Sequence, residues 1–378
     1  MFITLVKVNM IRILLKSAPT FSSFILSLWL TGLHAAGHDK TMDKDQVDIN
    51  IGIYAPFSNQ HAFIGRNILG AMEMARDQLK PSRVKYSFYT LDKVPENRNP
   101  VSTLQKFIKA HKIKVLLTEG SVNGRLLASF AKKNNLIHFS MASDPKIADG
   151  KNNFLVWSPA YEQASVLVKT LKQKKINQLG IITTNHPSDR VLTQTVMKQL
   201  KTDSSIKIAA YEKYEVGTKD FSGMIDKIKG KNSDLYFIMA SPEDIELIQS
   251  EMKKAHINKP VTSIVERVTP KVMQVFNGQW YIDTHEMKPE FVNQYQETNL
   301  NYPVTEAGYA FDVFHLLNQS VIMAAKVRSN FTSQDLAEQI NSLAFGTGVM
   351  GPFNLDKNGV LYTQSQVKQV NKGVIHTA

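Results

Sequence analysis

The chain has 378 residues and a formal net charge of +12, and it contains no cysteine. The absence of thiols excludes disulfide bonds, thiolate metal sites and a cysteine nucleophile. The densest basic run, Lys172, Lys174 and Lys175, falls at the end of a predicted helix, where cations suit the helix dipole. We therefore interpret the positive charge as solvated helix faces, and no nucleic-acid-binding signature accompanies it.

The first 36 residues have the pattern of an export signal. Basic residues precede an apolar stretch at 21–33, which is shorter than the ~20 residues needed to span a bilayer. Small residues at 35–36 offer a cleavage site. We expect residues 1–36 to be a signal peptide that begins at Met1 or Met10, with an uncleaved membrane anchor as the alternative.

The residues after this signal predict an exported protein. Residues 37–46 are rich in His, Asp and Lys and predict a disordered tail. No later segment is apolar for long enough to cross a membrane, and no cysteine is present to carry an amino-terminal lipid. We expect a soluble periplasmic protein without a lipid anchor.

Strand-like and helix-like segments alternate from residue 47 almost to the end of the chain. The first strand, 47–56, is apolar and β-branched. The helix after it carries an apolar stripe made of Ile64, Ile68, Met72, Ala75 and Leu79. Further strands are predicted at 84–91, 115–117, 137–139, 153–157, 179–182, 206–210, 235–239, 261–264 and 279–283, with helices between most of them. One open sheet rarely holds more than about ten strands, so the pattern predicts two α/β lobes.

Four phrases, taken in order and spacing, resemble one family. The first is IGIYAP at 51–56 with GAMEMA at 70–75, and the second is FSMASDP at 139–145. The third is DFS at 220–222 with the stretch to Asp234, and the fourth is GVMGPFNLD at 348–356 with Asn-Gly at 358–359. The chain resembles the leucine/isoleucine/valine-binding proteins, which are type I periplasmic solute-binding proteins of amino-acid importers. The likeness covers about residues 48–371.

The resemblance implies an α/β fold of two Rossmann-like lobes joined by a hinge of three crossovers. The crossovers are expected near 157–159, 280–282 and 346–348. The implied lobes are 47–157 with 283–346, and 158–282 with 347–378. The implied protein is the solute-binding component of an ABC importer and acts as a monomer. It closes around an amino acid or a similar small polar solute, and the membrane permease then recognises the closed form.

A zwitterionic ligand needs hydrogen-bond donors for its carboxylate. The loop at 120–124 opens a helix directly after a buried strand, so its N–H groups and the Ser121 hydroxyl suit an anion. The alternative is that Ser121 only caps the helix. By resemblance, Ser143 supplies a second hydroxyl and Met141 or Ala142 a backbone contact.

For the ligand's ammonium group, the resemblance points to Glu266, which follows the predicted strand 261–264. The alternative is a loop glutamate that pairs with its neighbour Arg267. Phe63 matches an aromatic residue that packs on the ligand in family members. The alternative for Phe63 is a hydrophobic staple of the helix after it.

Two positions depart from the family pattern. Where family members often have aromatic residues, this chain has a loop at 183–188 that ends in Ser188, and it has Ser241 before Pro-Glu. Without these aromatics, the cleft loses apolar packing on the side chain of a branched ligand. At ~25 cal/mol per Å² of buried apolar surface, this is a few kcal/mol of binding free energy. We include both serines in the candidate site, and we expect either a ligand more polar than leucine or a cleft that has lost tight capture.

Nothing in the chain predicts catalysis, a metal or a cofactor. The loop at 120–124 is not a Gly-x-Ser-x-Gly elbow, and neither a His-Glu-x-x-His motif nor a Walker phosphate loop occurs. His138, alone within a predicted strand, is typical of a satisfied core residue. The second hypothesis is a periplasmic scaffold or activator of the same fold, whose degenerate cleft leaves it to bind a partner protein. A secreted hydrolase is the weakest candidate.

Overall fold

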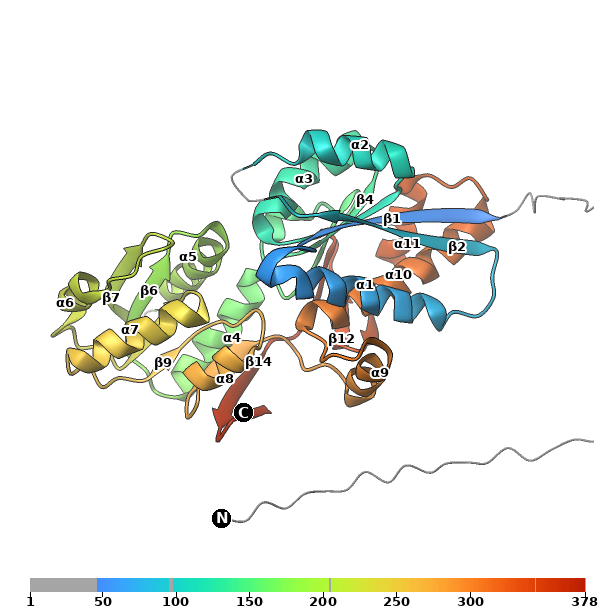
Figure 1. Cartoon of the computed structure of the whole chain (residues 1–378). Coiled ribbons are helices and arrows are strands. Elements are labelled where there is room, and N and C mark those ends of the chain that lie inside the picture. Colours follow the sequence, from blue (N-terminus) through green and yellow to red (C-terminus); the bar gives the residue numbers. More distant parts are fainter. Residues whose placement is uncertain (1–45, 95–97, 204, 344, 378) are drawn as a thin grey trace, which may run out of the picture. The chain divides into compact units, whose positions relative to one another are not determined.

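The computed structural model describes residues 46–94, 98–203, 205–343 and 345–377. The predicted signal peptide, and the predicted tail up to residue 45, lie outside these residues. The described strands form three sheets, and helices alternate with strands through most of the chain (Figure 1). The predicted α/β class is confirmed.

The largest sheet has eight strands in the order β11-β12-β13-β5-β4-β3-β1-β2. They are β1 (Val47–Ala55), β2 (Val84–Asp92), β3 (Val115–Glu119), β4 (Ile137–Met141), β5 (Asn153–Val156), β11 (Phe345–Gly348), β12 (Gly351–Leu355) and β13 (Val360–Thr363). The central strands pair in parallel, and β12 is antiparallel to both of its neighbours. The carboxyl ends of the parallel strands therefore share one edge, where such sheets bind ligands.

The remaining strands form two smaller sheets. A parallel sheet has the order β7-β6-β8-β9, and an antiparallel sheet has the order β10-β14-β15. The strands are β6 (Gln178–Thr184), β7 (Lys207–Tyr214), β8 (Leu235–Met239), β9 (Val261–Thr262), β10 (Trp280–Asp283), β14 (Gln366–Asn371) and β15 (Val374–Thr377). A parallel bridge between Ile264 and Ile282 links the residues after β9 to β10.

The helices cover the sheets with their apolar faces. They are α1 (Ala62–Asp77), α2 (Val101–His111), α3 (Ser121–Lys133), α4 (Ala160–Gln173), α5 (Pro187–Thr202), α6 (Ser222–Ile228), α7 (Pro242–Lys254), α8 (Pro270–Val275), α9 (Pro289–Asn299), α10 (Thr305–Val327) and α11 (Ser333–Ser342). The stripe predicted for this helix is confirmed for Ile64, Ile68, Met72 and Ala75, which are buried in one core with β1 and α10. Leu79, the fifth predicted member, is partly buried and lies two residues beyond the end of α1. None of the helices in the described part of the chain has both the length and the apolar character needed to cross a membrane.

The third connection between the large sheet and the smaller ones lies later than predicted. The glycines at 346–348 predict a crossover, but they belong to β11, which forms a hairpin with β12. The hairpin is tight because Gly348 and Gly351 pair across it, and Gly351 has a φ of +86°. β13 then pairs with β5, so β11, β12 and β13 all lie in the large sheet. Placing residues 347–363 in the second lobe is therefore wrong, and the chain crosses at 364–365.

Buried hydrogen bonds tie the crossing segments together. The Ser158 hydroxyl donates to the carbonyl of Thr363 at 2.8 Å, and the hydroxyls of Tyr309 and Thr363 lie 2.9 Å apart. Lys368 on β14 forms a buried ion pair with Asp283 on β10, with an Nζ–Oδ2 distance of 2.9 Å. These bonds satisfy polar groups that the crossings bring out of water.

Candidate functional site

A cavity of about 170 Å³ lies at the carboxyl edge of the large sheet. On this side it is lined by Glu119 at the end of β3, Ser121 at the start of α3, Met141 at the end of β4, and Trp157 just after β5. Ala142 completes the turn after β4. These positions follow from the parallel pairing of β3, β4 and β5, which brings their ends side by side.

The opposite side of the cavity comes from the second group of strands. Ser188 and Asp189 lie in the first turn of α5, directly after β6, and Glu266 and Arg267 follow β9. Glu306, in the first turn of α10, also lines the cavity. The ends of strands from two different sheets therefore face one small polar space.

The structure brings most of the predicted site residues together but not all of them. Those that line the cavity are Ser121, Met141, Ala142, Ser188 and Glu266. Ser143 is fully buried, and its hydroxyl lowers the pKa of Glu266 without completing a well-formed hydrogen bond. Ser241 does not line the cavity. It is the exposed N-cap of α7, where its hydroxyl accepts the Asp244 N–H at 3.1 Å.

Ser121 lies inside the first turn of α3 and does not cap the helix. The N-cap of α3 is Gly120, which has a φ of +92° and, as a glycine, no side chain to cap the helix. Ser121 is the first helical residue and is 3% exposed. The N–H groups of this first turn have no intrahelical acceptor, so they are available to a ligand's oxygen atoms. The capping alternative for Ser121 is therefore wrong.

Glu266 has an unusual electrostatic environment. Burial raises its pKa to about 7, and the nearby charge of Asp189 adds to the rise, while Arg267 and the Ser143 hydroxyl partly offset it. Burial also raises the pKa of Asp189, although the Thr184 hydroxyl donates to it at 2.6 Å. Both carboxyl groups face the same cavity, and a bound cation there would favour their ionised forms.

Arg267 does not pair with Glu266, contrary to the alternative that the sequence left open. Its Nε lies 2.9 Å and 3.2 Å from the two carboxylate oxygens of Glu306, and its Nη2 also contacts Glu306. The same Nη2 lies 3.7 Å from Glu119, which is held at 3.1 Å by Lys93. Arg267 thus connects the segment after β9 to β3 and α10.

Phe63 contacts Arg267 and does not line the cavity. The guanidinium carbon of Arg267 lies 5.9 Å from the centre of the Phe63 ring, which is a cation–π distance. Phe63 is the second residue of α1, so it does not occupy the position before the N-cap that a hydrophobic staple requires. The staple alternative is therefore wrong, and the aromatic ring packs on a side chain of the protein itself.

Some site residues escaped the sequence reasoning. Glu119 lies two residues after the predicted strand 115–117, so the strand-end rule was a signal for its position. Asp189 lies beyond the loop after the predicted strand 179–182, in the first turn of α5, where that signal is weaker. Trp157 also follows a strand, but a hinge role was assigned to it. Lys93 and Glu306 come from segments far apart in the chain, and only the folded chain brings Lys93 to Glu119 and Glu306 to Arg267.

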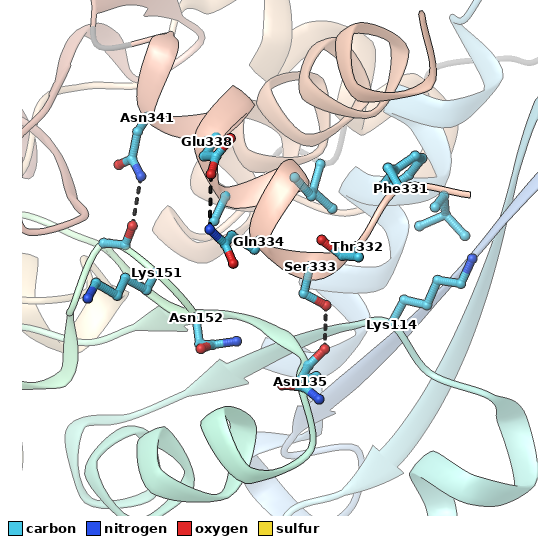
Figure 2. A pocket seen from close by; sticks show the side chains of 14 residues that line it. Lys114, Asn135, Lys151, Asn152, Phe331, Thr332, Ser333, Gln334, Glu338 and Asn341 are labelled. Atoms are coloured by element: carbon cyan, nitrogen blue, oxygen red, sulfur yellow. Dashed lines mark hydrogen bonds between the residues drawn. The ribbon is translucent and has the colours of Figure 1, made fainter. Parts of the chain in front are cut away.

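A larger cavity, of about 870 Å³, lies at the opposite edge of the large sheet, where its strands begin (Figure 2). Its polar groups largely bond to one another. The Ser333 hydroxyl donates to the Asn135 carbonyl, Asn341 donates to the Gly150 carbonyl at 2.7 Å, and Gln334 contacts Glu338. This edge lacks the strand-end loops that form binding sites in parallel sheets, so we assign the candidate site to the smaller cavity.

His138 is a core residue, as predicted. Its ring nitrogens bond to the Thr118 hydroxyl at 2.8 Å and to the Asn153 side-chain oxygen at 2.9 Å. Burial lowers its pKa to about 4, so the ring stays neutral. In the described part of the chain, no three His, Asp or Glu side chains are grouped to hold a metal ion.

A sequence profile of the periplasmic binding protein family matches residues 48–374. The chain belongs to this family. A comparison with curated proteins gave no match.

Solved structures of family members share the fold. A leucine-binding protein LivK from Thermotoga maritima is 17% identical and has a TM-score of 0.74, with 87% of this chain and 97% of that chain covered. LivJ from Streptococcus pneumoniae, in complex with isoleucine, is 17% identical with a TM-score of 0.73, covering 88% and 99%. A solute-binding protein from Rhodopseudomonas palustris HaA2, in complex with p-hydroxybenzoic acid, is 16% identical with a TM-score of 0.73, covering 87% and 95%.

These relatives define the type I periplasmic binding protein fold for this chain. Solved relatives include solute-binding proteins of ABC transporters, and the ligands in their structures range from amino acids to benzoates. Identities of this size establish the shared fold alone. The ligand of this chain therefore has to be inferred from its own cavity.

Proposed function

We propose that this protein is a periplasmic solute-binding protein of an ABC importer that captures an amino acid or a similar small amine-bearing solute. The observation that carries the proposal is the cavity at the ends of β3, β4, β6 and β9, which pairs a helix N-terminus with a carboxylate. Ser121 and the first turn of α3 offer donors to a carboxylate or carbonyl oxygen. Glu266 on the opposite side offers an acceptor to an ammonium group.

In this proposal, binding stabilises a closed arrangement of the two lobes. A ligand that contacts Ser121 and Glu266 at once is bound by residues from both groups of strands, so it favours the arrangement in which they are close. The permease then recognises that arrangement. The predicted export signal places the protein in the periplasm, and we expect it to act as a monomer.

The test is a thermal-shift screen of amino acids, amino alcohols, amides and small carboxylates with the purified mature chain. A solute at 100 times its Kd stabilises the protein by ~2.7 kcal/mol, which raises the melting temperature measurably. Glu266→Ala should abolish the shift given by an α-amino solute. Glu297→Ala, an exposed glutamate on α9, serves as the matched control and should leave the shift unchanged.

One observation favours the scaffold hypothesis as a second candidate. Arg267 already bridges Glu306 and Glu119 and contacts Phe63, the aromatic residue that the family resemblance assigns to the ligand. A cleft held by its own arginine needs no solute to stay closed. If a broad solute panel gives no melting shift, the solute-binding proposal fails and this second candidate takes its place.

A further inference from the structure

The described residues that line the cavity carry more negative than positive charge. Glu119, Asp189, Glu266 and Glu306 are four carboxyl groups, whereas Lys93 and Arg267 are the two lysine or arginine side chains. Counting these six side chains alone, four minus two leaves a formal excess of two negative charges when all four acids are ionised. His186 also lines the cavity, and its charge lowers the pKa of Asp189. The negative charge of the cavity would repel a benzoate or another solute with a net negative charge.

The ion pairs within the cavity show which carboxyl groups carry the excess negative charge. Arg267 pairs with Glu306, and Lys93 pairs with Glu119. Neither Glu266 nor Asp189 forms an ion pair with a lysine or arginine in the described part of the chain. The two groups face the same cavity, and the charge of Asp189 acts on Glu266.

A second, independent feature of the cavity is an unpaired hydrogen-bond donor that an acceptor atom of a ligand would satisfy. Trp157 lines the cavity and is 4% exposed, yet its buried indole N–H has no hydrogen-bond partner. A buried donor without an acceptor is unfavourable, and an acceptor oxygen on a solute would remove that penalty. The face of an indole ring also attracts cations.

Building on the proposed function, we propose that the solute of this site carries a net positive charge, and that Asp189 together with Glu266 selects for it. The solute is a small primary amine with a hydroxyl or carbonyl oxygen and no carboxylate. Its ammonium group lies between the two carboxylates, and its oxygen lies toward Ser121 and Trp157. Asp189 is thus a specificity-determining residue, at a place where the family pattern often has an aromatic side chain nearby.

The size of the cavity limits the solute. An apolar cavity of about 150 Å³ holds benzene, which has six heavy atoms. A cavity of about 170 Å³ therefore suits a solute of similar size, about six to nine heavy atoms. Amino alcohols and short diamines fall in this range, whereas long peptides and nucleosides do not.

Three solutes that share one branched side chain test the charge directly. Valinol is a cation at pH 8, valine is a neutral zwitterion, and 3-methylbutanoate is an anion. In calorimetric titrations of the unmodified protein at pH 8, we expect valinol to bind at least about tenfold more tightly than valine, as close charge pairs at interfaces do. 3-Methylbutanoate should not bind measurably.

The variant Asp189→Asn tests which residue selects. It should weaken valinol binding by about tenfold or more and reduce the preference for valinol over valine. Asp226→Asn makes the same chemical change at an exposed position on α6 and should alter neither affinity. The ranking of the three solutes tests the inference even if Asp189→Asn fails to fold.

The possible outcomes separate this inference from the proposed function. If valine or 3-methylbutanoate binds more tightly than valinol, the cationic inference is overturned while solute binding stands. If Asp189→Asn binds valinol like the unmodified protein, Asp189 does not select for charge. If none of these solutes binds, and the broad screen is also negative, the inference and the proposed function fail together.

Discussion

Replacing Glu266 by glutamine should stabilise the protein in a way that depends on pH. The pKa of Glu266 is raised from its ordinary value of 4.5 to about 7, mainly by burial. Between pH 4.5 and 7 the folded protein therefore binds a proton that the unfolded chain has lost. Stability falls as the pH rises through this window, because folding then requires a buried carboxylate to be charged.

The size of the effect follows from the shift. The Glu266 pKa differs between the unfolded and folded states by about 2.5, which lowers the free energy of unfolding at pH 8 by at most ~3 kcal/mol. Water that enters the cavity screens the charge and reduces this value. Glu266→Gln keeps the shape of the side chain and removes the charge. If the roughly 330 residues from Asp45 onward melt as one unit, the melting temperature should rise by about 5 °C at pH 8 and be unchanged at pH 4.

The assay is calorimetric melting of the unmodified protein and of Glu266→Gln at half-unit steps from pH 4 to pH 9. Glu297→Gln, at the exposed position on α9, is the control and should follow the unmodified protein throughout. A difference between Glu266→Gln and the unmodified protein that does not change with pH would refute the reasoning. So would a variant that is less stable at pH 8.

Three further predictions concern binding, the arginine bridge and the hairpin. An ammonium group binds Glu266 only when this carboxyl group is ionised, so the affinity for an amine solute should rise about tenfold per pH unit between pH 5 and pH 7. Calorimetric titrations measure this affinity, and an affinity that does not change with pH would show that Glu266 does not bind the solute. Arg267→Gln leaves the buried Glu306 without its partner and should cost about 3 kcal/mol in urea unfolding; an unchanged midpoint would show that the bridge is not formed. Gly348→Ala places a Cβ atom 2.1 Å from a carboxylate oxygen of α10 and should destabilise by about 1–3 kcal/mol, whereas Gly223→Ala, with nothing within 4 Å, should not; equal effects in the same urea assay would contradict this packing.

The periodicity of the sequence predicted most of the fold. The β-branched run of β1 and the four-residue spacing of Ile64, Ile68 and Met72 each match one kind of element, and the structure buries them as expected. The error at the third crossover has a physical cause. Glycines suit both a hinge and a two-residue hairpin turn, and the sequence alone does not show that β13 pairs with β5.

The candidate site was predicted where local rules apply. Ser121 and Glu266 follow buried strands, so the parallel arrangement places them at one edge of their sheets. The partners of Arg267 were not predicted, because Glu119 and Glu306 are separated from it by long stretches of chain and only tertiary structure joins them. For the same reason the sequence paired Arg267 with its immediate neighbour.

A crystal structure of the protein grown with the solute that gives the largest melting shift would show the binding mode itself. We expect electron density for the solute in the 170 Å³ cavity, with its amine within hydrogen-bond distance of Glu266 and an oxygen at the first turn of α3. Density in the 870 Å³ cavity under α11, or a solute that touches neither Glu266 nor Ser121, would contradict it.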